Sequence, residues 1–154
     1  MRVKDLMEAS PAAVHLDDPI SAAADLMVQG HVGAVPVVDD AGRLVGVVRD
    51  LDVLHLLLPD YLESLADLGF LPPDLEPGVC GIAEACGLPV RQAVEDQEPD
   101  SAEEDEPLLE AVRTMVEGGL DTLPVVRDGV LVGVLAARRV LRDMAGSTDQ
   151  AGPS

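Results

Sequence analysis

The chain contains the stretch Val-Pro-Val-Val-Asp-Asp-Ala-Gly-Arg-Leu-Val-Gly-Val-Val at residues 35–48, and a near copy, Leu-Pro-Val-Val-Arg-Asp-Gly-Val-Leu-Val-Gly-Val-Leu, at residues 123–135. Each copy begins and ends in an apolar run, and a turn sequence with a glycine separates the two runs. Two such runs around a short turn are typical of a β-hairpin. Because the runs are almost continuously apolar, we expect both faces of the strands to be buried.

The repetition extends on both sides of the two hairpins. Residues of the first copy return 88 positions later, and the spacing falls to 87 after one residue is lost in the turn. The matched pairs are Pro19 with Pro107, Met27 with Met115, Gly30 with Gly118, Pro36 with Pro124, and Gly46 with Gly133. A register this constant indicates an internal duplication.

Each copy is predicted to place one helix before its hairpin and another after it. Apolar residues at helical spacing from Ile20 to Val28 predict the first helix. Asp18 is expected to cap its start, with Pro19 in the first helical position. Gly30 is expected to end it in a left-handed conformation.

Further elements complete the first copy. Residues 14–16 are predicted to form a short strand, and residues 51–58 a closing helix. Each unit therefore reads strand, helix, strand, strand, helix. The helix between the first two strands predicts a parallel pair joined by a right-handed crossover, and the hairpin adds an antiparallel pair.

The predicted fold is α/β with mixed sheets, built from two β-α-β-β-α repeats that pack sheet to sheet with pseudo-two-fold symmetry. One repeat alone buries too little surface to be stable. We expect repeat 1 at residues 1–58, a helical and loop connector at 59–89, repeat 2 at 90–145 and a disordered tail at 146–154. The connector should hold a helix at 61–68 and a further turn of helix at 79–86.

Composition excludes several classes of partner. The 154 residues carry 29 Asp and Glu against ten Lys and Arg, a formal charge of −19. Nucleic acids and anionic membranes are therefore not expected partners. We found no signal-peptide pattern and no apolar run that would span a bilayer, so a cytoplasmic location is expected. Cys80 and Cys86 match no redox or zinc motif and are interpreted as free thiols.

The duplicated residues resemble a tandem pair of cystathionine β-synthase (CBS) domains, the regulatory unit also called a Bateman module. Three features carry the resemblance: the proline at the helix start, the Gly-(x)5-Pro-Val-Val pattern of residues 30–38, and the Leu-Val-Gly-Val strand in each copy. The resemblance implies two clefts between the paired sheets, which in this family commonly bind adenosine-containing ligands. It also implies a flat dimer of two modules.

The family's ligand signature is Gly-h-h-Thr/Ser-x-x-Asp, where h is apolar, after the last strand. Its Asp accepts hydrogen bonds from the ribose hydroxyls, and its Thr or Ser contacts a phosphate. In the first copy the signature falls on residues 46–52, so Asp52 takes the ribose position. Arg49 replaces the hydroxyl residue, and its guanidinium can still donate charge-assisted hydrogen bonds to a phosphate.

The second copy departs further from the signature. Ala136 replaces the hydroxyl residue and Arg139 replaces the acid, and a guanidinium cannot accept a hydrogen bond from ribose. The second cleft is therefore expected to be degenerate. Arg138 and Arg139 are expected instead to face phosphates of a ligand held mainly by the other copy.

The resemblance also implies cleft contacts by residues at the starts of strands. Such residues either pack only within the strands or also contact the base of a ligand with their backbone groups and apolar side chains. They are Val14, Ala34, Val35, Pro36, Thr122, Leu123 and Pro124.

An acidic run occupies residues 95–106, and two interpretations of it are kept. Eight of its side chains are carboxylates, and Glu104 and Asp105 are expected close to the opening of the second cleft. The run is either a solvated loop or a sensor of divalent cations such as Mg²⁺. No metal-ligand set is assigned.

No enzyme constellation is found, because no Ser, His and acid fall at an interpretable spacing and no phosphate-cradling Gly-rich loop is present. The sequence predicts a regulatory protein that is not an enzyme. It would sense AMP, ADP, ATP or S-adenosylmethionine, need no obligatory cofactor, form a homodimer and act on a separate client protein. The alternatives are a ligand-free dimerisation module and a magnesium sensor.

Overall fold

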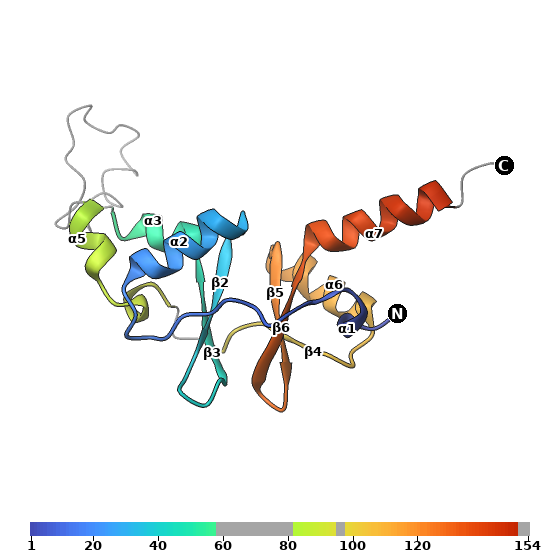
Figure 1. Cartoon of the computed structure of the whole chain (residues 1–154), viewed down its shortest axis with the longest axis horizontal. Helices are drawn as coiled ribbons and strands as arrows, with labels where there is room; N and C mark the ends of the chain where they lie inside the picture. The colour runs from blue at the N-terminus through green and yellow to red at the C-terminus, as the bar shows by residue number, and fades with distance from the viewer. Residues whose placement is uncertain (58–81, 95–97, 151–154) are drawn as a thin grey trace.

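The computed structural model describes residues 1–57, 82–94 and 98–150. Figure 1 shows two hairpins standing side by side with their turns at the same end. The first pairs β2 (Ala34–Val38) with β3 (Leu44–Arg49), and the second pairs β5 (Thr122–Arg127) with β6 (Val130–Ala136). Both pairs are antiparallel, so the hairpins predicted from the repeated stretch are confirmed.

Helices precede and follow each hairpin, as the repeat pattern predicts. In the first repeat they are α2 (Ile20–Gly30) and α3 (Asp50–His55), and in the second α6 (Leu108–Gly118) and α7 (Ala137–Gln150). The connector contributes α5 (Ile82–Gly87), close to the helical turn expected at 79–86. The helix expected at 61–68 lies outside the described residues.

The first strand of each repeat pairs parallel to the hairpin, as the crossover rule predicts. In the second repeat, β4 (Ala102–Glu103) pairs with β5, which gives a four-stranded sheet in the order β1-β6-β5-β4. In the first repeat, Val14 makes a single parallel bridge to Val37. The strand expected at 14–16 is thus one bridge long.

The N-terminal segments of the two repeats are exchanged. The first, α1 (Val3–Leu6) with β1 (Glu8–Ala9), packs on the second repeat, where β1 pairs antiparallel with β6. The segment that opens the second repeat, the 3₁₀ turn η1 (Val90–Ala93), packs on the first. Figure 1 shows α1 beside α6, at the far end of the molecule from α2. Sequence periodicity carried no signal for this exchange.

The exchange obeys the predicted pseudo-two-fold symmetry. The N–H of Val3 donates to the carbonyl of Glu106, and the N–H of Val90 donates to that of Asp18, the equivalent position. The ion pair of Lys4 with Asp105 is matched by that of Arg91 with Asp17. The hairpin turns are also joined reciprocally, by Leu44 N–H to Gly129 O and Leu131 N–H to Gly42 O, both 3.0 Å.

Two hydrophobic clusters form the core, and each contains residues of both repeats. Around the first hairpin, Ile20, Val37 and Val48 pack with Val90 and Ala93 of η1. Around the second hairpin, Leu123, Val125 and Leu135 pack with Val3 and Leu6 of α1. Because each cluster is completed by the other repeat's segment, neither repeat buries its sheet alone.

The close approach of the exchanged segments explains the glycine inside each Leu-Val-Gly-Val strand. A Cβ placed on Gly133 would lie 2.8 Å from the carbonyl oxygen of Glu8, and one on Gly46 would lie 2.6 Å from a methyl group of Val94. Both distances are too short without a shift of the neighbour, so a glycine is needed at position 133, where the backbone of β1 approaches, and is favoured at position 46, where a side chain does.

Three local expectations are corrected. The disordered tail does not begin at residue 146, because α7 continues to Gln150. The left-handed residue that ends α2 is His31, with φ +52°, because the helix includes Gly30. Asp18 does not cap α2: its carboxylate accepts the N–H of His15 at 2.8 Å, and Pro19 precedes the first helical residue.

Candidate functional site

Two cavities flank the place where the hairpins begin, and Ala34 and Thr122 line both of them. The first cavity has a volume of about 350 Å³ and the second about 570 Å³. Each combines the end of one repeat's last strand with the start of the other repeat's hairpin. Each cavity is therefore shared between the two repeats, and the sequence did not predict which strand ends come together.

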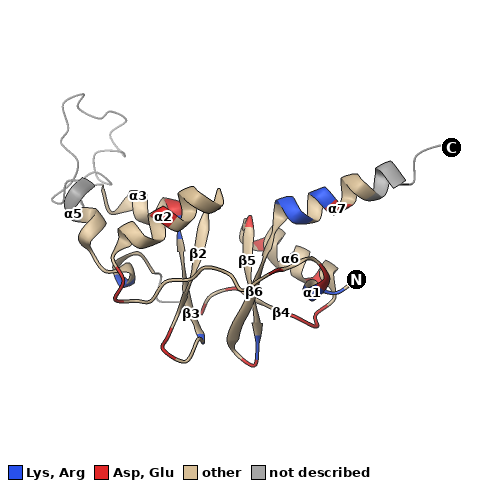
Figure 2. Ribbon diagram, in the orientation of Figure 1, with Lys and Arg blue, Asp and Glu red and all other residues tan. Residues whose placement is uncertain are grey.

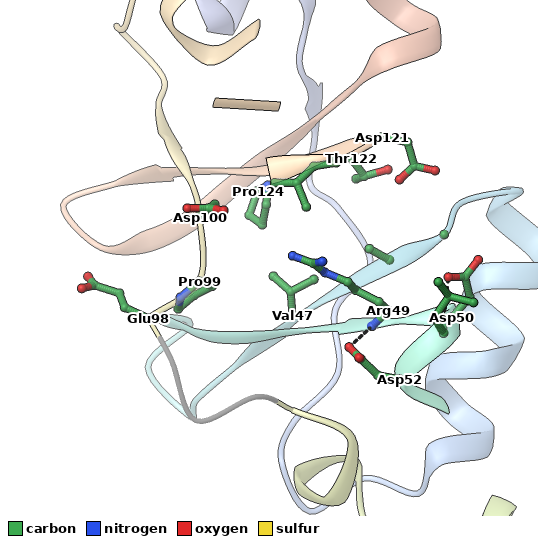
Figure 3. A pocket seen from close by; sticks show the side chains of 15 residues that line it. Val47, Arg49, Asp50, Asp52, Glu98, Pro99, Asp100, Asp121, Thr122 and Pro124 are labelled. Carbon is green, nitrogen blue, oxygen red and sulfur yellow. Dashed lines mark hydrogen bonds between the residues drawn. The ribbon is translucent and has the colours of Figure 1, made fainter. Parts of the chain in front are cut away.

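The first cavity joins the signature of the first repeat to the hairpin of the second. Arg49, Asp50 and Asp52 line it from the end of β3 and the start of α3, and Thr122 and Pro124 line it from β5. Figure 3 shows the Arg49 side chain reaching across the cavity toward Pro124 and Thr122. Among the described residues, no carboxylate pairs with this guanidinium, so its donors are open to a ligand.

Asp52 has a local role as well as a place in this cavity. Its Oδ2 accepts the backbone N–H of Arg49 at 3.3 Å, a contact that helps start α3. The bond is long, and a carboxylate offers about four lone-pair directions. Asp52 therefore keeps acceptor capacity for a further partner (Figure 3).

The first cavity is strongly acidic. Five carboxylates line it against one guanidinium; they are Asp50, Asp52, Glu98, Asp100 and Asp121. Two of them converge from different repeats, because a Cβ on Gly33 would lie 3.1 Å from Asp121 Oδ2 and 3.3 Å from Asp50 Oδ2. Such a site favours an uncharged or cationic ligand over a free polyphosphate.

The second cavity is basic. Arg138, Arg139 and Arg142 of α7 line it from the second repeat, while Ala34, Val35 and Pro36 of β2 line it from the first. Figure 2 shows blue at the start of α7, the helix that carries these arginines, while red is spread over hairpin turns, loops and other helices. Glu8 is the only carboxylate among its described lining residues.

Most predicted site residues line one of the two cavities, but Arg138 and Arg139 do not share a cavity with Asp52 as expected. Arg138 and Arg139 line the second cavity and do not join Asp52 in the first, so they are not placed to hold phosphates of a ligand bound at Asp52. Val14 and Leu123 line neither cavity. Their exposed fractions are 2% and 0%, and each packs in a hydrophobic cluster.

Sequence reasoning missed several lining residues. Asp50 and Asp121 line the first cavity and Arg142 lines the second, and the sequence predicted a site role for none of them. The sequence also predicted no site role for Glu8, Ser10, Pro11 and Ala12, which line the second cavity. A signal existed for Arg142, which lies four residues after Arg138 and therefore on the same helix face.

The acidic segment divides into two parts: Glu98 and Asp100 line the first cavity, whereas Glu104 and Asp105 are held in local ion pairs. The Lys4 ammonium donates to Asp105 at 2.8 Å, and its hydrogen bond lowers the pKa of that carboxyl. A hydrogen bond from Arg127 likewise lowers the pKa of Glu104. Glu104 and Asp105 line neither cavity, so the expectation that they border the second cleft is wrong.

Metal binding gains no support from the residues described. Within them, no three His, Cys, Asp or Glu side chains come together in a way that could hold an ion. Among the described helices, none has the length and apolar character needed to cross a bilayer. Cys86 is free and half-buried, and Cys80 lies outside the described residues.

Comparison with known families gives the same internal duplication. A family model described as "CBS domain" matches the chain twice, at residues 3–59 and 90–146. A CBS domain-containing protein of Dictyostelium discoideum is 28% identical over 140 residues, which cover 90% of this chain and 88% of the relative. The uncharacterised protein MJ1225 of Methanocaldococcus jannaschii is 24% identical over 135 residues, and the match spans only 40% of its length.

Solved structures share the whole architecture. The crystal structure of CBSX2 in complex with AMP superposes with a TM-score of 0.70 at 27% identity, covering 96% of this chain and 98% of that one. The CBS domain pair of protein MJ0100, solved with 5′-methylthioadenosine and S-adenosylmethionine, gives a TM-score of 0.67 at 22% identity, with 96% and 98% covered. The fold predicted from the sequence is confirmed.

Proposed function

This chain belongs to the CBS domain family, and we propose that it is a regulatory module that binds an adenosine-containing ligand in the cavity around Asp52. The observation that carries the proposal is the position of Asp52, which lines a cavity walled by both repeats. The AMP complex of CBSX2 supports the ligand class. The module is proposed to act on a client protein and to catalyse no reaction.

The cavity offers a separate contact for each part of such a ligand. Asp52 would accept hydrogen bonds from the two ribose hydroxyls, which is the role that its place in the signature implies. Val47 and Pro124 line the same cavity and offer apolar surface to a base. Because two repeats supply these groups, a bound ligand would tie the hairpins together, and this change in rigidity is what a partner could detect.

Replacing Asp52 tests this site. We expect Asp52→Ala to weaken binding of the preferred adenosine ligand by about 10- to 100-fold, because hydrogen bonds to a charged group contribute about 1.5–3 kcal/mol. Isothermal titration with AMP, ADP, ATP, 5′-methylthioadenosine and S-adenosylmethionine gives the measurement. Asp52→Asn, which keeps one acceptor for the Arg49 N–H, separates ligand contact from helix capping.

Asp40→Ala is the matched control, since Asp40 is exposed in the first hairpin turn and lines neither cavity. It removes the same charge and should leave affinity unchanged. Equal losses of ligand affinity in Asp52→Ala and Asp40→Ala would show that the effect comes from the overall charge of the protein and not from contact at Asp52. If no adenosine ligand binds more tightly than millimolar, the ligand-free interaction module becomes the better description.

We also propose that two copies associate through their helices. Equivalent apolar residues are exposed on both repeats: Val28 and Val116 are 74% and 76% exposed, and Leu54 and Leu141 are 54% and 62% exposed. An apolar face that recurs at symmetry-related positions is suited to a second copy, because a two-fold interface brings the same patch from each partner.

Adding a carboxylate to this face should produce monomers. We expect Val116→Asp combined with Leu141→Asp to shift the protein from dimer to monomer in sedimentation velocity, because burying an unpaired carboxylate is unfavourable. Ala41→Asp, in the exposed turn of the first hairpin, is the control and should stay dimeric. A monomeric unaltered protein at micromolar concentration would contradict the proposal.

A further inference from the structure

The two cavities differ in charge, and this difference bears on which ligand each can take. The first has five carboxylates and one guanidinium among its described lining residues, whereas the second has three guanidinium groups and one carboxylate. The chain as a whole carries only ten Lys and Arg at a net charge of −19. Three of its few cationic side chains therefore line a single cavity.

Two of these arginines are available to a ligand. Arg138 donates to the carbonyl of Gly30 at 3.1 Å, which fixes the start of α7 against the end of α2. Arg139 and Arg142 are exposed and make no ion pair with any described carboxylate. The first turn of α7 lies beside them, and the partial positive charge of a helix N-terminus adds to the attraction for an anion.

Two further lining residues of the second cavity have a left-handed backbone conformation. Ser10 and His31 line it, and both have positive φ, +54° and +52°. Asp128, in a hairpin turn, is the one other non-glycine residue of this kind in the described chain. Left-handed conformations cost energy for residues with a side chain, and they collect at ligand sites. The left-handed conformation of His31 is that of the residue ending α2, so the end of this helix forms part of the wall.

We propose that charge sorts ligands between the cavities: the arginine-lined cavity takes a phosphate-bearing nucleotide, with its phosphates against Arg139 and Arg142, and the Asp52 cavity takes an adenosine ligand without phosphates. The assignment of a phosphate-free ligand to the Asp52 cavity rests on the proposed function, whereas the assignment of a nucleotide to the arginine-lined cavity does not depend on it. The sulfonium and amine of S-adenosylmethionine would suit the five carboxylates of the first cavity. Free triphosphate would be repelled there. Arg139 stands where the signature has its ribose-binding acid, and on this proposal the replacement means that the second cavity binds a different class of ligand, not that it binds none.

Titrations with two probes test the sorting: ATP without divalent cations, and 5′-methylthioadenosine. We expect Arg139→Gln with Arg142→Gln to weaken ATP binding at least about tenfold and to leave 5′-methylthioadenosine binding unchanged. Asp52→Asn should do the reverse. In the unaltered protein, both probes should bind together, and only ATP binding should weaken steeply with added salt.

The charge-matched control is Arg43→Gln with Arg113→Gln, which removes two exposed guanidinium groups outside both cavities. Equal ATP losses in the two double variants would overturn the proposal, as would absence of ATP binding at millimolar concentration. If ATP binding depends on Asp52 and not on the arginines, the sorting fails while the proposed function stands. If 5′-methylthioadenosine does not bind but ATP binding needs the arginines, the Asp52 site fails and the anion site stands.

Discussion

Replacing Leu123 with alanine should lower the free energy of unfolding by about 2–5 kcal/mol, the range found when a buried leucine is truncated. Leu123 is 0% exposed and stands opposite Leu135 in the β5–β6 register. It packs in the cluster that Val3 and Leu6 complete from the other end of the chain. A small protein has only about 5–15 kcal/mol of stability in total, so the variant should unfold at much lower denaturant.

The control is Leu109→Ala, the same chemical change at a side chain that is 80% exposed on α6. Its stability should change by no more than about 0.5 kcal/mol. Chemical denaturation at one protein concentration gives both values. Ligand affinity, measured where Leu123→Ala is still folded, should be unchanged, since Leu123 lines neither cavity. A loss of affinity without loss of stability would instead place Leu123 at a ligand.

Gly133→Ala should destabilise the protein by about 1–3 kcal/mol, the usual cost of forcing an extra methyl group into a packed site. The new Cβ would meet the Glu8 carbonyl oxygen and the Met7 sulfur, both at 2.8 Å. Neither the backbone of β1 nor its pairing with β6 can be kept without a shift. Because Glu8 and Ser10 line the basic cavity, ATP binding there should weaken while binding at Asp52 is retained.

Two other glycines provide controls for this prediction. Gly146→Ala, whose Cβ would meet nothing within 4 Å beyond the adjacent residues and the helix's own backbone, should stabilise α7 by about 0.5–1 kcal/mol through helix propensity. Gly46→Ala should lie between the two, because its contacts are only with the Val94 side chain. If Gly133→Ala were as stable as the unaltered protein, β1 would not cross β6 as closely as described.

The duplication made the fold predictable. The spacing of 88 residues between Pro36 and Pro124, and of 87 between Gly46 and Gly133, indicated where the hairpins lie and that the halves match. Short-range patterns report which residues are in contact along one element or turn. They do not report which distant strand ends meet, because that depends on how the two halves dock.

The candidate site depends on docking, and there the sequence was less informative. Asp52 and Arg49 could be found from the signature, yet their neighbours Asp121 and Thr122 come from the other repeat. The signature indicates only that Arg139 replaces an acid, and the structure places it with Arg142 in a separate basic cavity. Leu123 reads as a strand-start residue, but in the structure it is buried in the cluster that Val3 and Leu6 of α1 complete.

The exchange of N-terminal segments has a consequence for synthesis of the chain. As the polypeptide leaves the ribosome, the first hairpin emerges early, but Val90 and Ala93 must follow before its core is closed. The second core waits for β6 and meanwhile leaves Val3 and Leu6 without their partners. Contacts this distant in sequence slow folding. We therefore expect the second core of a nascent chain to stay open, and exposed to chaperones, until β6 has emerged from the ribosome.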